Sequence, residues 1–320
     1  MKRKNYLTIE EQIALLESKG LNIPHKKFAK QVLSQIGYYK LINAYKFPFI
    51  DSSKEDGHYL PNINFEHLYL LYQFDLQLET IVFKATTSAE IELKAHISDL
   101  ISKQYGISPA KYLNAQNYLS QNSSGMQFSE LKREVNKQIR IQGDKHPAIM
   151  WYKENYNSSF PFWVISNILT IGNISKFYSF FKPSDQTSVS REYSLSPDNL
   201  TQFIVHINHV RNICAHNDVL YRYKSKNTIP QNNIKAVYSF LNIRKNSKTG
   251  RFEYGTNDFL ATLIVLKFLI NDSIAYNNLI TSVNGALSNL KKRIPQNSYD
   301  IIVNSLGLLT NWYELPKYKK

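Results

Sequence analysis

An arginine and a histidine frame the segment VRNICAH, in which Arg211 and His216 stand five positions apart. Cleaving RNA without a metal requires a base for the 2′-hydroxyl proton, an acid for the leaving 5′-oxygen and a cation for the phosphorane charge. A histidine can perform either proton transfer near neutral pH, because its ordinary pKa is about 6.5. An arginine stays charged and presents a fixed fork of donors to phosphate. The pair, with Asn212 to orient either group, predicts metal-independent phosphodiester chemistry.

The spacing of this pair raises a geometric problem, because positions five apart on an ideal helix differ by about 140°. Arg211 and His216 would then leave the helix on different faces. Two arrangements stay open. The helix ends or distorts near Ala215, with Asn217 as a left-handed cap, or a two-fold dimer brings two motifs into one cleft. A histidine that only stabilises the helix dipole is the simpler alternative for His216.

Other chemistries find little support. The sequence has no Walker A loop, GxGxxG, HExxH, GxSxG or paired CxxC. His206, His209 and His216 do not share one helix face, and no acid there supplies an obvious further ligand. We therefore expect neither a metal nor another cofactor. Cys214 lies on the apolar stripe, which predicts an inert buried thiol rather than a nucleophile.

The helix that must position the motif has clear start signals. Ser196 is a good N-cap, Pro197 fits the first helical position and Asp198 complements the helix dipole. Beyond His216 the chain turns basic and irregular. The basic residues there are the predicted RNA contacts, and they are Arg222, Lys224 and Lys226.

Hydrophobic periodicity predicts helices through the rest of the chain. Thr8 and Glu11 form a capping box, and Gly20 ends the helix that it starts. Asp75 lies on the apolar stripe of a long helix, so it should accept hydrogen bonds inside the core. A break is expected at Gly172. The remaining predicted elements are helices near 28–36, 65–102, 128–141, 257–272, 274–292 and 298–312, a loop-rich segment at 103–127 and a small hairpin at 238–254.

The chain shows no internal repeat and no convincing linker. We expect a helical domain over residues 61–320 with an N-terminal helical extension over residues 1–60, or one continuous domain. The two short helices of the extension allow a helix-turn-helix interpretation, but packing is the commoner reason for such a pair.

The net charge limits the classes of partner that the protein is expected to bind. The 320 residues include 39 Lys and Arg and 25 Asp and Glu, a net charge of +14. Such an excess favours nucleic acid or an anionic membrane surface. No stretch approaches the ~20 apolar residues of a spanning helix, and the basic start leads into an acidic helix instead of a signal core. One cysteine fits a reducing compartment. We therefore expect a cytoplasmic protein without a membrane partner.

The motif and its surroundings resemble the AbiD/AbiF abortive-infection family, a branch of the HEPN superfamily. The likeness covers roughly residues 6–222, and the last ~100 residues carry no distinctive block. Besides VRNICAH, the similar segments, in the family's order, are LT and EQI within residues 7–13, IGYYKL at 36–41, YQFDL at 72–76, AEIELK at 89–94 and PFWVI at 161–165 with Gly172.

The resemblance implies an all-α, HEPN-type helical bundle with additional N- and C-terminal helices, a homodimer, and phage defence that acts on RNA. It also implies a cognate small non-coding RNA, because members of the AbiF branch are associated with one. Arg211 and His216 match the superfamily's catalytic pair, and Asn212 matches its polar second position. Glu90 falls where the family has an acid on another helix, which implies support for the site. At a position where the family has a basic residue, this chain has Val219, so the resemblance implies that the RNA contacts after the motif differ.

Three functions remain at this stage. The first is an endoribonuclease that acts as a toxin or abortive-infection effector and leaves 2′,3′-cyclic phosphate ends, with His216 as base or acid and Arg211 on the phosphate. The second is a non-catalytic RNA-binding defence protein. The third is a helix-turn-helix DNA-binding regulator. The resemblance favours the first.

Overall fold

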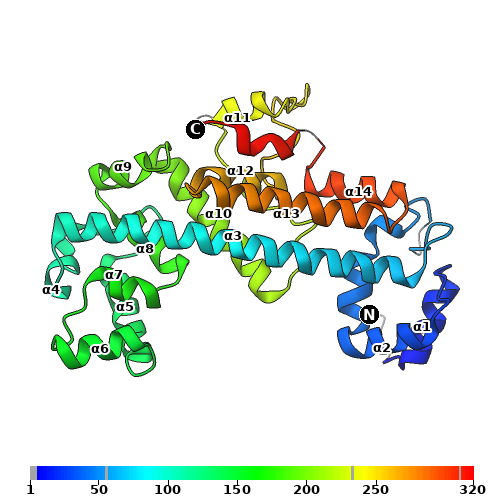
Figure 1. Cartoon of the computed structure of the whole chain (residues 1–320), viewed down its shortest axis with the longest axis horizontal. Helices are drawn as coiled ribbons and strands as arrows, with labels where there is room; N and C mark the ends of the chain where they lie inside the picture. Colours follow the sequence, from blue (N-terminus) through cyan, green and yellow to red (C-terminus); the bar gives the residue numbers. More distant parts are fainter. Residues whose placement is uncertain (1–5, 55–56, 232–233, 310) are drawn as a thin grey trace.

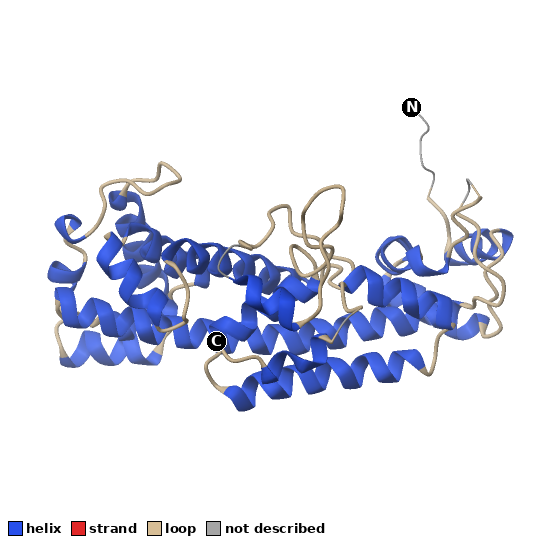
Figure 2. Cartoon of the chain, turned by 90° about the horizontal axis from the view of Figure 1, so that it is seen from above, coloured by secondary structure: helices blue, strands red, loops and turns tan. Residues whose placement is uncertain are grey.

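The computed structural model describes residues 6–54, 57–231, 234–309 and 311–320. The basic residues 1–5 lie outside the described residues. The described part is helical and contains isolated β-bridges but no strand, which confirms the all-α fold (Figures 1 and 2). None of its helices is long and apolar enough to cross a membrane.

One long helix, α3 (Phe65–Tyr105), runs along most of the molecule (Figure 1). Its 41 residues span about 60 Å. Asn64 caps its start by accepting the backbone N–H of His67, and Gly106, at φ +90°, ends it. The predicted helix over 65–102 is therefore confirmed. Elements from the N-terminal, middle and C-terminal parts of the chain pack against this helix.

The N-terminal segment packs at the start of α3. It contains α1 (Ile9–Ser18), α2 (Lys26–Ile36), a π-helical turn (Tyr39–Asn43) and a 3-10 turn (Phe47–Phe49). The capping box of Thr8 and Glu11 forms as predicted, and Gly20 follows at φ +84°. Phe28 packs edge-on against Phe65 and Tyr69 of α3. The domain boundary near residue 60 and the helix-turn-helix interpretation stay predictions.

The far half of α3 carries a group of shorter helices, at the left of Figure 1. They are α4 (Pro109–Tyr112), α5 (Phe128–Gln142), α6 (Pro147–Asn155), α7 (Phe162–Ile165), α8 (Ile171–Phe180) and α9 (Pro183–Arg191). The helix break expected at Gly172 lies instead at Leu169 and Thr170. The Thr170 side chain accepts the Asn173 N–H and starts a new helix there, and Gly172 lies inside that helix.

The C-terminal third returns along α3 with α11 (Lys235–Phe240), α12 (Phe259–Leu269), α13 (Ser273–Lys291), α14 (Gln296–Leu306) and a 3-10 turn (Trp312–Lys317). The helix predicted over 298–312 ends early, since Gly307 adopts a left-handed conformation at φ +74°. The predicted hairpin at 238–254 reduces to one antiparallel bridge, Lys245 with Phe252, around a turn at Gly250.

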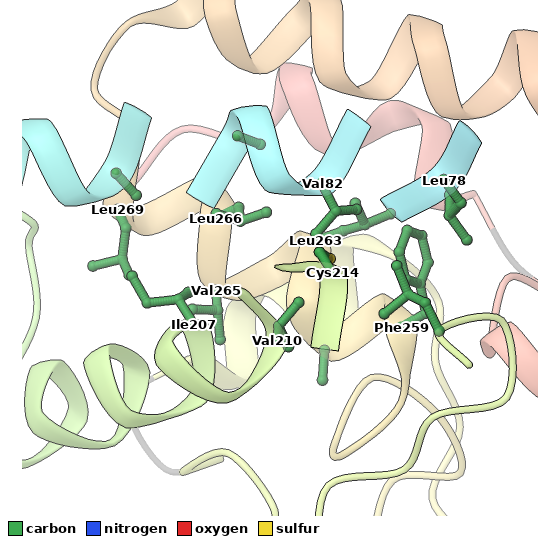
Figure 3. Packing of buried hydrophobic residues seen from close by; sticks show 14 of the residues in the cluster. Leu78, Val82, Ile207, Val210, Cys214, Phe259, Leu263, Val265, Leu266 and Leu269 are labelled. Atoms are coloured by element: carbon green, nitrogen blue, oxygen red, sulfur yellow. The ribbon is translucent and has the colours of Figure 1, made fainter. Parts of the chain in front are cut away.

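The core that fixes the motif lies where α12 packs against both α3 and the motif helix, which also contact each other (Figure 3). Leu263 and Leu266 of α12, Val82 of α3 and Val210 of the motif helix belong to this hydrophobic core (Figure 3). All four side chains are buried. Shortening one such leucine to alanine would reduce stability by about 2–5 kcal/mol. The motif is therefore attached to a rigid part of the fold.

Candidate active site

The motif occupies the last turns of α10 (Pro197–His216). The Ser196 side chain accepts the Asn199 N–H and Pro197 stands in the first turn, as predicted. Asn217 ends the helix at φ 51° and ψ 47°, which confirms the predicted left-handed cap. The helix thus stays regular through His216, and no distortion occurs near Ala215.

A regular helix separates the two predicted catalytic side chains. Arg211 and His216 leave α10 about 140° apart. Arg211 turns toward α3, where it contacts two side chains. His216 and Asn212 are exposed to solvent. Within one chain, the structure does not bring the guanidinium and the imidazole onto one face.

Glu90 of α3 is the acidic partner of Arg211. Its Oε2 lies 3.8 Å from the Arg211 Nε, and its Oε1 lies 2.8 Å from the Lys94 Nζ. The Arg211 guanidinium also lies over the Phe83 ring, 5.4 Å from the ring centroid, a cation–π geometry. Among the described residues, the buried Arg211 Nε has no hydrogen-bond partner. The arginine is therefore oriented from two sides, while about a third of its side chain stays exposed.

Asp75 secures the chain that follows the motif. Its carboxylate accepts the backbone N–H groups of Leu220 and Tyr221, at 3.1 Å and 2.7 Å, and the Tyr45 hydroxyl at 3.0 Å. The prediction that Asp75 accepts hydrogen bonds in the core is confirmed. Burial raises the pKa of Asp75 to about 7, although these donors favour the charged form. The turn after His216 is thereby tied to α3.

Glu79 is a second buried acid that the sequence reasoning missed. It lies one turn after Asp75 and is 3% exposed. Neither of its carboxylate oxygens has a hydrogen-bond partner among the described residues. Burial, with the charge of Asp75, raises the pKa of Glu79 to about 8. The signal in the sequence was an acid four positions from Asp75, which places both on one face of the helix.

Residues 31–222 match the model of the family described as Abi-like protein, about three fifths of the chain. The chain belongs to the Abi-like family. The family's name points to abortive infection, a form of phage defence. No curated protein and no solved structure matches the chain. The matched region runs from α2 to the turn after α10, so it includes both Glu90 and the motif of this Abi-like protein.

Two other titratable groups of α10, His206 and Cys214, are buried and uncharged near neutral pH. His206 lies in the core with its Nε2 3.0 Å from the Thr262 hydroxyl, and burial lowers its pKa to about 4. Cys214 is buried as predicted, and burial raises the pKa of its thiol to about 12. Within the described ranges, no three His, Cys, Asp or Glu side chains gather in a way that could hold a metal ion.

The three predicted RNA contacts separate into two places. The Arg222 guanidinium lies 5.7 Å from the centroid of the Phe47 ring. Lys224 and Lys226 line a cavity of about 660 Å³ beside α10. The Lys224 Nζ lies 3.6 Å from the buried Asp258 carboxylate, while Lys226 is exposed. The structure therefore brings the two lysines together and places Arg222 against the N-terminal segment.

Proposed function

We propose that this Abi-like protein is an abortive-infection effector that cleaves RNA without a metal, as a HEPN-type ribonuclease of the AbiD/AbiF branch. The observation that carries the proposal is the environment of Arg211. A buried carboxylate and an aromatic ring orient this guanidinium, while about a third of the Arg211 side chain stays exposed to solvent. Structural arginines normally use their donors inside the protein, whereas a phosphate-binding arginine needs free ones.

In the proposed reaction the ribose 2′-oxygen attacks phosphorus and the bond from phosphorus to the 5′-oxygen breaks. An imidazole of His216 takes the 2′-hydroxyl proton or gives a proton to the leaving 5′-oxygen, and water makes the other of these two proton transfers. Arg211 stabilises the charge that develops on the phosphoryl oxygens, and Asn212 orients the pair. The products are a 2′,3′-cyclic phosphate and a 5′-hydroxyl, and Glu90 acts through Arg211 as a positioning residue.

A homodimer would resolve the angular separation on α10. Because Arg211 and His216 diverge on a regular helix, a two-fold axis near the end of α10 would place the arginine of one chain opposite the histidine of the other. The exposure of His216 and Asn212 is compatible with such an interface. A small non-coding RNA that controls the activity belongs to the same proposal.

The first test is cleavage of total cellular RNA by purified protein in EDTA. We expect the wild type to produce cyclic-phosphate ends, and His216→Ala and Arg211→Ala to lose cleavage. His25→Ala removes another exposed histidine and is the matched control. Full cleavage by the Arg211→Ala, His216→Ala double variant would refute the proposal.

A mixture of the two single variants tests the dimeric site. If each cleft takes its arginine and histidine from different chains, a random mixture of Arg211→Ala and His216→Ala should regain about a quarter of wild-type cleavage, because half the dimers are mixed and each holds one intact pair. No recovery, with exchange of subunits verified, would assign both groups to one chain.

A second candidate is an RNA-binding defence protein without catalysis. The net charge of +14 and the lysine-lined cavity favour it. Its affinity for RNA should fall steeply with salt, because phosphate contacts release counterions. His216→Ala should leave that affinity unchanged.

A further inference from the structure

The cavity of about 660 Å³ lies between α10 and the segment that follows the motif. Val205, His206 and His209 form part of its helical side. Residues 223–229 form the opposite side. This volume falls within the range of about 300–1,000 Å³ that is typical of small-ligand sites. The cavity uses a face of α10 that Arg211 does not share, since residues 205 and 211 differ by about 120° around the helix.

The side chains that line the cavity favour an anionic ligand that has a flat, partly apolar group. Lys226 supplies an exposed ammonium group, and Lys224 supplies a second one that also pairs with the buried Asp258 carboxylate at 3.6 Å; the described residues that line the cavity include no Asp or Glu. Val205 and the buried Ile229 supply apolar surface, and the half-buried Tyr223 supplies an aromatic side chain. Phosphate groups pair with lysine, and unstacked nucleobases are held by aromatic and apolar side chains.

The walls of the cavity are held by the core. The His206 ring, 5% exposed, is fixed by its contact with Thr262 of α12. On the opposite side, the backbone N–H of Ser225 donates to the Asn257 carbonyl at 2.7 Å, and that of Ile229 donates to the Thr256 carbonyl at 2.7 Å. Both walls are therefore preorganised, which reduces the entropy lost when a ligand binds.

The cavity lies on the same side of α10 as His216. His209 and His216 are seven residues apart, so they differ by about 20° around the helix and by about 10 Å along it. The helix is regular over this stretch. A nucleotide in the cavity would therefore belong to the same strand that passes His216.

We infer that this cavity is a substrate subsite that takes one unstacked nucleotide of single-stranded RNA, with its phosphate at Lys224 and Lys226 and its base against Val205 and Tyr223. The inference rests on the proposed function for its substrate class. It adds the segment of RNA that is recognised and the residues that recognise it.

Filling the cavity tests the inference. Val205 is 38% exposed, and Val205→Trp places an indole in the space that the base would occupy. Ile141→Trp, on α5 and 42% exposed, is the matched control away from the cavity. The probe is a short single-stranded RNA with 2′-O-methyl groups, which cannot be cleaved, so that binding is measured alone. We expect Val205→Trp to weaken binding at least tenfold and Ile141→Trp to change it less than twofold, with melting temperatures verified for both.

A charge reversal provides an independent readout. Lys226→Glu should weaken RNA binding and reduce its salt dependence by about one counterion. Lys137→Glu, an exposed lysine on α5, makes the same change of net charge elsewhere. Adenosine monophosphate is the second probe. If it binds the wild type but not Val205→Trp, a single nucleotide suffices to fill the cavity. If only the RNA binds tightly, the cavity takes its nucleotide as part of a strand.

The outcomes separate this inference from the proposed function. If the wild type binds the RNA and Val205→Trp does not, the subsite stands even if neither protein cleaves RNA in EDTA. If the wild type cleaves RNA but Val205→Trp and Lys226→Glu both bind as tightly as the wild type, the ribonuclease proposal stands and the subsite is refuted. Failure of the wild type to bind short single-stranded RNA would also refute the subsite.

Discussion

Replacing Glu79 with glutamine should change how the stability of the protein depends on pH. The pKa of Glu79 is raised from 4.5 to about 8 in the folded protein. The folded state therefore holds this proton more tightly than the unfolded chain does. The stabilisation that comes from this bound proton is fully present below pH 4.5 and is lost as the pH rises toward 8. Well above pH 8 the loss is complete.

The magnitude follows from the same two pKa values. Integrating the difference in bound protons from pH 5 to pH 8 gives a loss of about 3.5 kcal/mol of unfolding free energy from Glu79 alone. Glu79→Gln has the same shape and does not titrate, so it should lack this loss. Its advantage in unfolding free energy over the wild type should therefore grow by about 3.5 kcal/mol between pH 5 and pH 8. Asp75 titrates in both proteins and contributes its own slope to each.

The assay is urea unfolding followed by far-ultraviolet circular dichroism at pH 5 and pH 8. Glu154→Gln, an exposed acid on α6, is the control and should behave as the wild type at both values. If the wild type and Glu79→Gln lose stability in parallel, the burial of an unpaired carboxyl at this position does not control the pH dependence, and the reasoning is wrong.

Three further results are expected. Asp75→Asn removes one of the carboxylate oxygens that accept the backbone N–H groups after the motif. It should lower the unfolding free energy by about 1–3 kcal/mol at pH 7 and speed hydrogen exchange at the Tyr221 amide. Unchanged exchange would contradict the anchoring role. Glu90→Gln should reduce kcat for RNA cleavage about tenfold with little change in the melting temperature, because Arg211 loses its orienting charge; an unaltered kcat would exclude Glu90 as a positioning residue. The Cys214 thiol should resist iodoacetamide at pH 8 until urea unfolds the protein, and rapid labelling of the native protein would contradict its burial.

Helix ends and buried stripes could be predicted because their causes are local. The capping box at Thr8, the Ser196 cap and the left-handed Asn217 each depend on a few neighbouring residues. Gly172 shows the limit of such reasoning. A glycine suggests a break, but Thr170 offers a better helix start two positions earlier, and competition between two local signals decides the boundary.

The site itself was only partly predictable, because its partners come from distant segments. The motif indicated which residues of α10 are candidates for chemistry, and the acid expected at Glu90 does lie beside Arg211. The Phe83 ring under the guanidinium and the cavity formed with Lys226 have no local signal, since their contacts depend on how α10 packs. The acid at Glu79 was visible in the sequence, yet one acid on an apolar stripe resembles many others.

A single stripe on α3 organises the end of α10. Asp75, Glu79, Phe83 and Glu90 follow one another at intervals of four, four and seven residues, which keeps them on one face of the helix. Asp75 binds the backbone after the motif, and the charge of Glu79 acts on the buried Cys214 thiol. Phe83 and Glu90 orient Arg211. Because the stripe belongs to one continuous helix, a shift of α3 along α10 would move the arginine and the turn after the histidine together. Asp75 and Glu90, which resemble defects in an apolar stripe, thus hold the backbone after the motif and the arginine within it.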